Sequence, residues 1–183
     1  DRYQTVFARV SGSAAAPTAG LHFTDPLLQA LAHRGIGRAD VTLHVGLDTF
    51  RPITAERLDD HPMHTEWCEC PAETAAAISA TQARGARVVA VGTTAVRTLE
   101  TAARAAPAGD PAAAWTGPTD LFIRPGHTFR AVDAMLTNFH MPRTTLMVLV
   151  SSFAGRDLIA RAYAEAIRER YRFLSYGDAM LLL

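Results

Sequence analysis

Polar side chains that could transfer protons or hold a ligand occur where apolar runs of the sequence end. Residues 17–23 form a dense series of small and turn-forming residues that then presents His22. A histidine that titrates near neutrality can act as an acid, a base or a hydrogen-bond donor. The alternative for this segment is an ordinary loop with a solvated histidine.

Residues 88–97 give the strongest general signal for a ligand site. An apolar run ends at Gly92, two hydroxyl residues follow (Thr93 and Thr94), and a helical pattern containing Arg97 begins. The free N–H groups and the dipole of a helix start favour an anionic group, and glycine lets that group approach the backbone. The segment has neither the three spaced glycines of a dinucleotide site nor the Gly-Lys-Ser/Thr of a phosphate loop. A capped helix after a core strand is the alternative.

Three other segments have a similar form and a weaker signal. The apolar run 41–45 contains His44, which fits a core histidine at least as well as a catalytic one. Residues 137–142 end a predicted strand with Asn138 and His140, and residues 175–180 place Tyr176 and Asp178 around a glycine. Each of these is more often a structural turn than a site.

Histidines and cysteines between residues 61 and 70 are of the types that bind metals. Their spacing does not match the usual zinc fingers, and a Cys-x-Cys pair in a strand has no loop that could fold around an ion. We therefore predict that Cys68 and Cys70 are small hydrophobic residues and that the chain has no metal site. The sequence also lacks the Gly-x-Ser-x-Gly of many serine hydrolases.

Composition sets the class of protein. The chain has 183 residues, 49% of them hydrophobic, with 18 basic and 18 acidic side chains. This predicts a single ordered domain over residues 1–183 and gives no support for non-specific nucleic-acid binding, although a local basic patch remains open. Arginines in and around the last predicted helix usually form a solvated face, but Arg156, Arg168 and Arg172 could contact phosphates. Two close cysteines favour a reducing compartment, and no apolar run is long enough to span a bilayer.

Apolar runs and helical patterns alternate along the chain. We predict strands over residues 5–9, 41–45, 87–91, 121–124 and 131–137. Helices are predicted over residues 25–34, 71–84, 93–106, 144–153 and 157–170, and a surface loop over 108–118. Such alternation predicts an α/β fold, with a mainly parallel sheet and helices on both faces in three layers.

Taken in order, these segments resemble the S-adenosylmethionine:tRNA ribosyltransferase-isomerases. The resemblance spans the chain and is carried by residues 3–6, 15–23, 41–46, 49–52, 63–64, 91–94, 96–97, 99–100, 137–140, 153–155, 171–173 and 175–180. Members of that family are about twice as long. The resemblance therefore implies the C-terminal part of the catalytic domain, without the family's upstream segment and inserted β-barrel domain.

The resemblance implies a function in queuosine biosynthesis. The ribosyl part of S-adenosylmethionine would be transferred to 7-aminomethyl-7-deazaguanine at the tRNA wobble position and isomerised to epoxyqueuosine, releasing adenine and methionine. S-adenosylmethionine would then be a consumed substrate, with no separate cofactor. The implied partner is a tRNA with a queuosine-type anticodon, and the whole protein would be a cytoplasmic monomer with no membrane contact.

Residue chemistry suggests roles within that reaction. The candidates for proton transfer are His22, His44, His140 and Asp178. The candidates for binding substrate are Thr18, Gly20, Gly46, Thr49, Gly92, Thr93, Thr94, Arg97, Asn138 and Tyr176. Within the second set, residues 92–97 suit the methionine carboxylate or a phosphate, and Thr49 and Asn138 suit sugar hydroxyls. The alternative is an inactive module that binds S-adenosylmethionine or tRNA without turnover.

Overall fold

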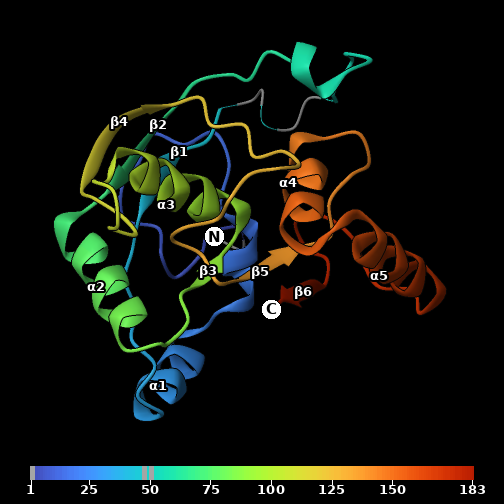
Figure 1. The fold of residues 1–183 in the computed structure, drawn as a ribbon. Coiled ribbons are helices and arrows are strands. Elements are labelled where there is room, and N and C mark those ends of the chain that lie inside the picture. Colours follow the sequence, from blue (N-terminus) through green and yellow to red (C-terminus); the bar gives the residue numbers. More distant parts are fainter. Residues whose placement is uncertain (1–2, 47–48, 50–51) are drawn as a thin grey trace.

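The computed structural model describes residues 3–46, 49 and 52–183 (Figure 1). Its helices are α1 (Asp25–His33), α2 (Ala72–Ala83), α3 (Thr93–Ala105), α4 (Thr145–Ala154) and α5 (Arg156–Arg168). Its strands are β1 (Thr42–His44), β2 (Glu66–Cys70), β3 (Val89–Val91), β4 (Trp115–Thr119), β5 (Ala134–Asn138) and β6 (Ala179–Leu182). Two short 3-10 turns are η1 (Thr18–His22) and η3 (Leu58–Asp60). Phe50 and Arg51, in the matched segment 49–52, lie outside the described residues.

The helices form where their local signals predict them. Thr24 precedes α1, and its hydroxyl accepts a hydrogen bond from the Leu27 N–H at 3.4 Å. Thr144 precedes α4 in the same way and accepts from the Met147 N–H at 3.2 Å. Such caps satisfy N–H groups that have no partner inside the helix. All five helices predicted from the sequence are confirmed, with ends within two residues.

The strands form two three-stranded sheets, in the orders β1-β2-β4 and β3-β5-β6. The α/β class is confirmed, but the prediction of one mainly parallel sheet is wrong. Among the described strands only β3 and β5 pair in parallel, and the other three pairs are antiparallel. The reason is that the chain changes sheet when it passes through α2 and again through α3. A helix between two strands therefore does not make those strands neighbours here.

Several predicted strands and loops are also corrected. Residues 5–9 form a turn in which the Thr5 hydroxyl accepts from the Phe7 N–H, a local bond that competes with a strand. Residues 121–124 form no strand. The predicted loop 108–118 contains most of β4, whose Gly117 and Pro118 mimic a loop signal. Proline is tolerated there because β4 is at the edge of its sheet.

Helix α3 is the centre of the fold. It contacts strands of both sheets (Figure 1). Its buried side chains include Val96, Leu99 and Ala102, which join Met135 of β5 and Leu149 of α4 in one core. The predicted arrangement of helices on both faces of one sheet is thus replaced by a helix shared between two small sheets.

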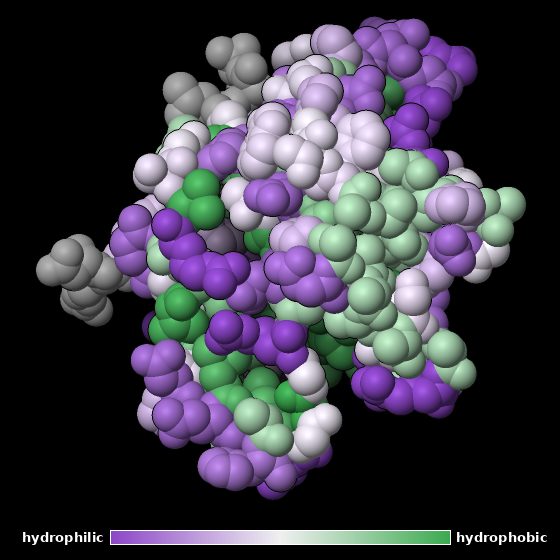
Figure 2. All heavy atoms as spheres, turned by 90° about the vertical axis from the view of Figure 1, so that its left-hand side faces the viewer, coloured by the Kyte–Doolittle hydropathy of each residue, from purple (hydrophilic) through white to green (hydrophobic). Residues whose placement is uncertain are grey.

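Helix α1 is peripheral by comparison. None of its residues is buried, and Leu27 is 40% exposed. Helix α1 lies at the bottom of the molecule in Figure 1. At the lower end of Figure 2, hydrophobic side chains (green) lie among hydrophilic ones (purple). The helix therefore adds little to the core around α3.

Candidate functional site

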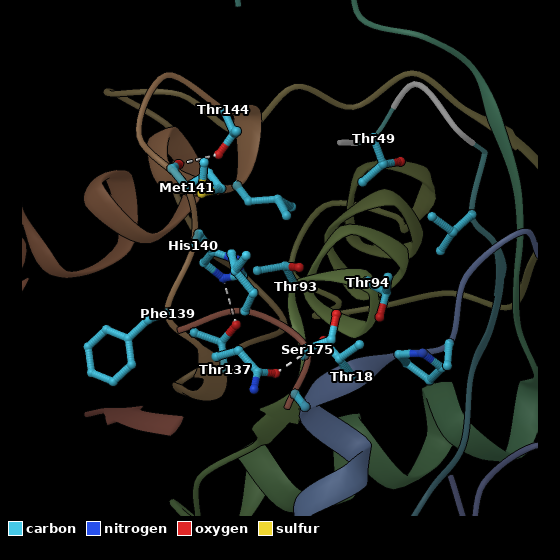
Figure 3. Close-up of a pocket in the computed structure, with 18 residues that line it drawn as sticks. Thr18, Thr49, Thr93, Thr94, Thr137, Phe139, His140, Met141, Thr144 and Ser175 are labelled. Atoms are coloured by element: carbon cyan, nitrogen blue, oxygen red, sulfur yellow. Dashed lines mark hydrogen bonds between the residues drawn. The ribbon is translucent and has the colours of Figure 1, made fainter. Parts of the chain in front are cut away.

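A cavity of about 260 Å³ opens where β3 and β5 end (Figure 3). Because these two strands are parallel, their carboxyl ends meet at the same edge of the sheet. Gly92 follows β3, and its N–H donates to the Leu136 carbonyl at 2.8 Å. The rest of the wall comes from η1, the starts of α3 and α4, the end of β5, residues 174–175, Val45 and Thr49. We call this space the first cavity.

A second cavity, of about 210 Å³, adjoins the first. It is lined by Leu21, His22, Arg172, Ser175, Tyr176, Gly177 and Asp178. Ser175 lines both cavities. The chain segments 16–22 and 174–178 thus meet at one place in the fold, although they lie far apart in the sequence.

The sequence-predicted site residues divide into three groups. The first cavity is lined by Thr18, Thr49, Gly92, Thr93, Thr94, Asn138 and His140. The second cavity is lined by His22, Tyr176 and Asp178. Neither cavity is lined by Gly20, His44, Gly46 and Arg97. The structure therefore brings most, but not all, of the candidates to one region.

Asn138 connects the two cavities. Its Oδ1 accepts from the Thr18 hydroxyl at 3.2 Å, and its Nδ2 lies 3.1 Å from His22 Nε2. This contact holds the His22 ring against the Asn138 amide. The Asn138 side chain is 3% exposed and has partners on both sides. This amide orients the His22 ring.

Two helix starts border the first cavity. Gly92 has a φ of +92°, a backbone angle that residues with a side chain rarely adopt. It turns the chain from β3 directly into α3. At the start of α4, the Thr144 hydroxyl donates to the Met141 carbonyl at 2.8 Å while capping the helix. Among the described residues, no Asp, Glu or Arg lines this cavity. The partial positive charges of the helix starts are therefore its main attraction for an anionic group.

His140 lies on the wall of the first cavity and is held from two sides. Its Nε2 is 2.9 Å from the Thr137 hydroxyl, and its backbone N–H donates to the Tyr163 hydroxyl at 2.7 Å. Burial lowers the pKa of the His140 imidazole to about 4. The ring is therefore neutral at neutral pH and suits a hydrogen bond to substrate better than proton abstraction.

This buried imidazole predicts a pH dependence of stability. Since the folded pKa lies below the unfolded value of about 6.5, the unfolded chain binds the proton first, and stability falls as pH drops from 6.5 towards 4. The loss expected from this group is about 3 kcal/mol across that window. Urea unfolding at several pH values measures it. His140→Gln should flatten the dependence, whereas His33→Gln on α1 should not. An equal slope in the wild type and His140→Gln would contradict the prediction.

Asp178 closes a tight loop by bonding to Arg172. Its carboxylate accepts from the Arg172 N–H at 2.7 Å and from Arg172 Nη2 at 3.2 Å. The bond from the backbone N–H and the bond and charge of the guanidinium hold the pKa of Asp178 below its usual value. Gly177 packs so closely on the backbone of Arg172 that a Cβ has no room there. These contacts shape the loop that presents Ser175 and Tyr176 to the cavities.

Arg97 is buried in an ion pair rather than presented to a ligand. It is 4% exposed, and its guanidinium bonds Glu66, whose side chain is 1% exposed. Glu66 also accepts from the Gly46 N–H at 2.7 Å and from the Thr49 hydroxyl at 2.5 Å. Burial raises the pKa of Glu66, but the hydrogen bonds from Thr49, Gly46 and Arg97 and the Arg97 charge together outweigh it, so the net shift is downward. This network supports the wall at Thr49.

His44 and Gly20 have structural surroundings. The His44 ring lies 5.0 Å from the ring of Trp67, its partner across β1 and β2. A Cβ on Gly20 would lie 3.1 Å from side-chain atoms of Phe7 and Thr5, so this glycine allows close packing of the first residues on η1. These contacts give both residues a structural role.

Sequence reasoning did not single out Glu66, Thr137, Thr144 or Ser175. Glu66 had a signal, because it takes an inward position in the alternating strand Glu66–Cys70, where its neighbours on the same face are the buried Cys68 and Cys70. A charged residue at such a position needs a buried partner. Ser175 had no such signal, since only the fold places it between two cavities.

The described residues contain no cluster of three or more His, Cys, Asp or Glu that could hold a metal ion. Both cysteines are free and buried, and burial raises the pKa of Cys70 to about 11.

Among the residues that the structure describes, no helix is long and apolar enough to cross a bilayer.

A parallel strand pair that ends in glycine and amide residues beside two helix starts is typical of ligand-binding α/β domains. Comparison with known sequences is more specific: the chain belongs to the queuosine biosynthesis protein family, whose sequence model matches residues 1–182.

Known relatives agree with this assignment. Over 182 residues the chain is 62% identical to a protein of Anaeromyxobacter dehalogenans (strain 2CP-1 / ATCC BAA-258) and 58% identical to one of Geobacter sulfurreducens, both called S-adenosylmethionine:tRNA ribosyltransferase-isomerase. Each match covers 100% of this chain and 52% of the relative. A crystal structure of the S-adenosylmethionine tRNA ribosyltransferase of Thermotoga maritima matches with a TM-score of 0.74 and 47% identity, over 90% of this chain and 51% of that one. The chain thus spans about half the length of these relatives, and the family predicted from the sequence is confirmed.

Proposed function

We propose that this chain forms the part of a tRNA ribosyltransferase-isomerase that binds S-adenosylmethionine and catalyses ribosyl transfer. The product would be epoxyqueuosine at the tRNA wobble position, formed on 7-aminomethyl-7-deazaguanine, with adenine and methionine released. The observation that carries the proposal is the identity of 62% over the full length of the chain with a relative of that name.

The geometry supports this chemistry through the residues it brings together. The reaction needs proton removal beside the sulfonium, and His22 is the candidate whose ring is oriented and reaches a cavity. The starts of α3 and α4 suit the methionine carboxylate. His140 and Thr18 offer hydrogen bonds to sugar hydroxyls at the same cavity.

The proposal has three further parts, which the similarity to the family suggests. S-adenosylmethionine acts as a consumed substrate without a further cofactor, and the RNA partner is a tRNA with a queuosine-type anticodon. The whole protein acts as a monomer in the cytoplasm. These features are expected of the longer protein as well as of this chain.

A single-turnover assay tests the proposal. The 183-residue chain is mixed with ribose-labelled S-adenosylmethionine and tRNA that carries the aminomethyl-deazaguanine, and adenine release and label transfer are followed. Transfer by the chain alone would mean that its cavities form a complete site. Transfer only after the N-terminal half of the Anaeromyxobacter relative is added would mean that the site is shared. No transfer in either case would contradict the proposal and favour a module that binds without turnover.

A further inference from the structure

The two adjoining cavities differ in charge. The first cavity is bordered by hydroxyl, amide and apolar side chains, with the neutral His140 as its one titratable ring among the described residues. The second cavity is bordered by His22, Arg172 and Asp178. Two adjoining cavities of different chemistry suit a reaction between two dissimilar substrates.

An exposed pair of aromatic rings stands at the second cavity. Tyr176 lines this cavity and is 61% exposed, and its ring packs edge-on against the ring of Tyr3, with centroids 5.7 Å apart. Tyr3 is itself 40% exposed. Proteins that bind unpaired nucleotides stack the bases on exposed aromatic rings. The first cavity has no comparable exposed pair among its described lining residues.

The same cavity carries an accessible cation. The Arg172 side chain is 75% exposed and spends one Nη2 contact on Asp178. A guanidinium has five N–H donors, so donors remain for a phosphate oxygen. Arg168, four residues earlier, is different because its guanidinium pairs with both Glu165 and Glu169.

We propose that the second cavity, with Tyr3 and Tyr176 at its rim, receives the unpaired nucleotide of the RNA substrate, while the first cavity receives S-adenosylmethionine. This assignment rests on the proposed function. The two substrates then meet at Ser175, which lines both cavities, and at the contact between Asn138 of the first cavity and His22 of the second. His22 is therefore placed where the nucleophilic amine of the RNA base approaches the ribose.

Separate binding measurements test the assignment. The probes are an anticodon stem-loop RNA, followed by fluorescence anisotropy, and S-adenosylmethionine, followed by equilibrium dialysis. Tyr176→Ala is expected to raise the Kd for RNA about tenfold and to leave that for S-adenosylmethionine unchanged. Tyr176→Phe keeps the ring and should bind RNA like the wild type. Thr94→Val, in the first cavity, should raise the Kd for S-adenosylmethionine roughly threefold or more and leave RNA binding unchanged.

Controls separate this assignment from general effects. Trp67→Ala removes another exposed aromatic ring, on β2, and should change neither Kd. Arg172→Gln should make the salt dependence of RNA binding shallower by about 0.7–1 in slope, and Arg168→Gln should not. If Tyr176→Ala leaves the Kd for RNA unchanged, or raises the Kd for S-adenosylmethionine instead, the assignment is overturned. A wild-type chain that binds S-adenosylmethionine but no RNA would also overturn it, whereas one that binds neither probe and transfers no ribose would contradict the proposed function itself.

Discussion

Replacing Arg97 by methionine is expected to lower the free energy of unfolding by about 3–5 kcal/mol. The reason is that Glu66 would keep its charge in the interior without the guanidinium that neutralises it. Both side chains are almost fully buried, and Glu66 also holds the Gly46 N–H and the Thr49 hydroxyl. Urea-induced unfolding followed by circular dichroism measures the change.

Two further variants show whether the buried charge is the cause. Arg168→Met removes an arginine whose side chain is 66% exposed, and its effect should stay below about 1 kcal/mol. Adding Glu66→Gln to Arg97→Met should recover part of the lost stability, because the uncompensated charge is removed. If Arg97 instead binds substrate directly, Arg97→Met will weaken S-adenosylmethionine binding with little change in unfolding. That outcome would restore the role expected from the sequence.

Local signals in the sequence predicted the helices and the turn at Gly92 well. Caps such as Thr24 and Thr144 act within three residues of themselves, so their effect is visible without the fold. The sheets were predicted poorly because pairing depends on the path of the chain between strands. Strand β6 shows this, since no strand was predicted over residues 179–182, which pair with β5 in the structure.

The candidate site shows the same division. Thr93 and Thr94 were predicted because a strand, a glycine and a helix start follow one another in the sequence. The contact between Asn138 and His22 joins residues 116 positions apart, so no local sequence pattern predicts it. Arg97 lies near a helix start, where it could bind an anionic ligand. Its guanidinium instead pairs in the interior with Glu66, 31 positions earlier in the sequence. Local patterns thus predict candidate site residues, and long-range contacts determine which of these candidates line the cavities.

Replacing His22 by alanine is expected to lower the single-turnover rate by about 10²–10⁴-fold. The physical reason is the loss of a ring that Asn138 orients at the junction of the two cavities. The rate of adenine release with saturating S-adenosylmethionine and tRNA is the measurement. Because His22 is tied to the rest of the wall by one hydrogen bond, its removal should change the free energy of unfolding by no more than about 1.5 kcal/mol.

His44→Ala is the matched comparison, because both histidines were candidates for proton transfer and the structure separates them. The His44 ring packs on Trp67 and borders neither cavity, so its loss should leave the rate within a few-fold of wild type once the protein is folded. A near-normal rate for His22→Ala would remove His22 from the mechanism. A large loss with His44→Ala at unchanged stability would instead place the catalytic group on β1, which requires a rearrangement of this strand when substrate binds. The pair of rates therefore tests whether the cavities described here are the site of the chemistry.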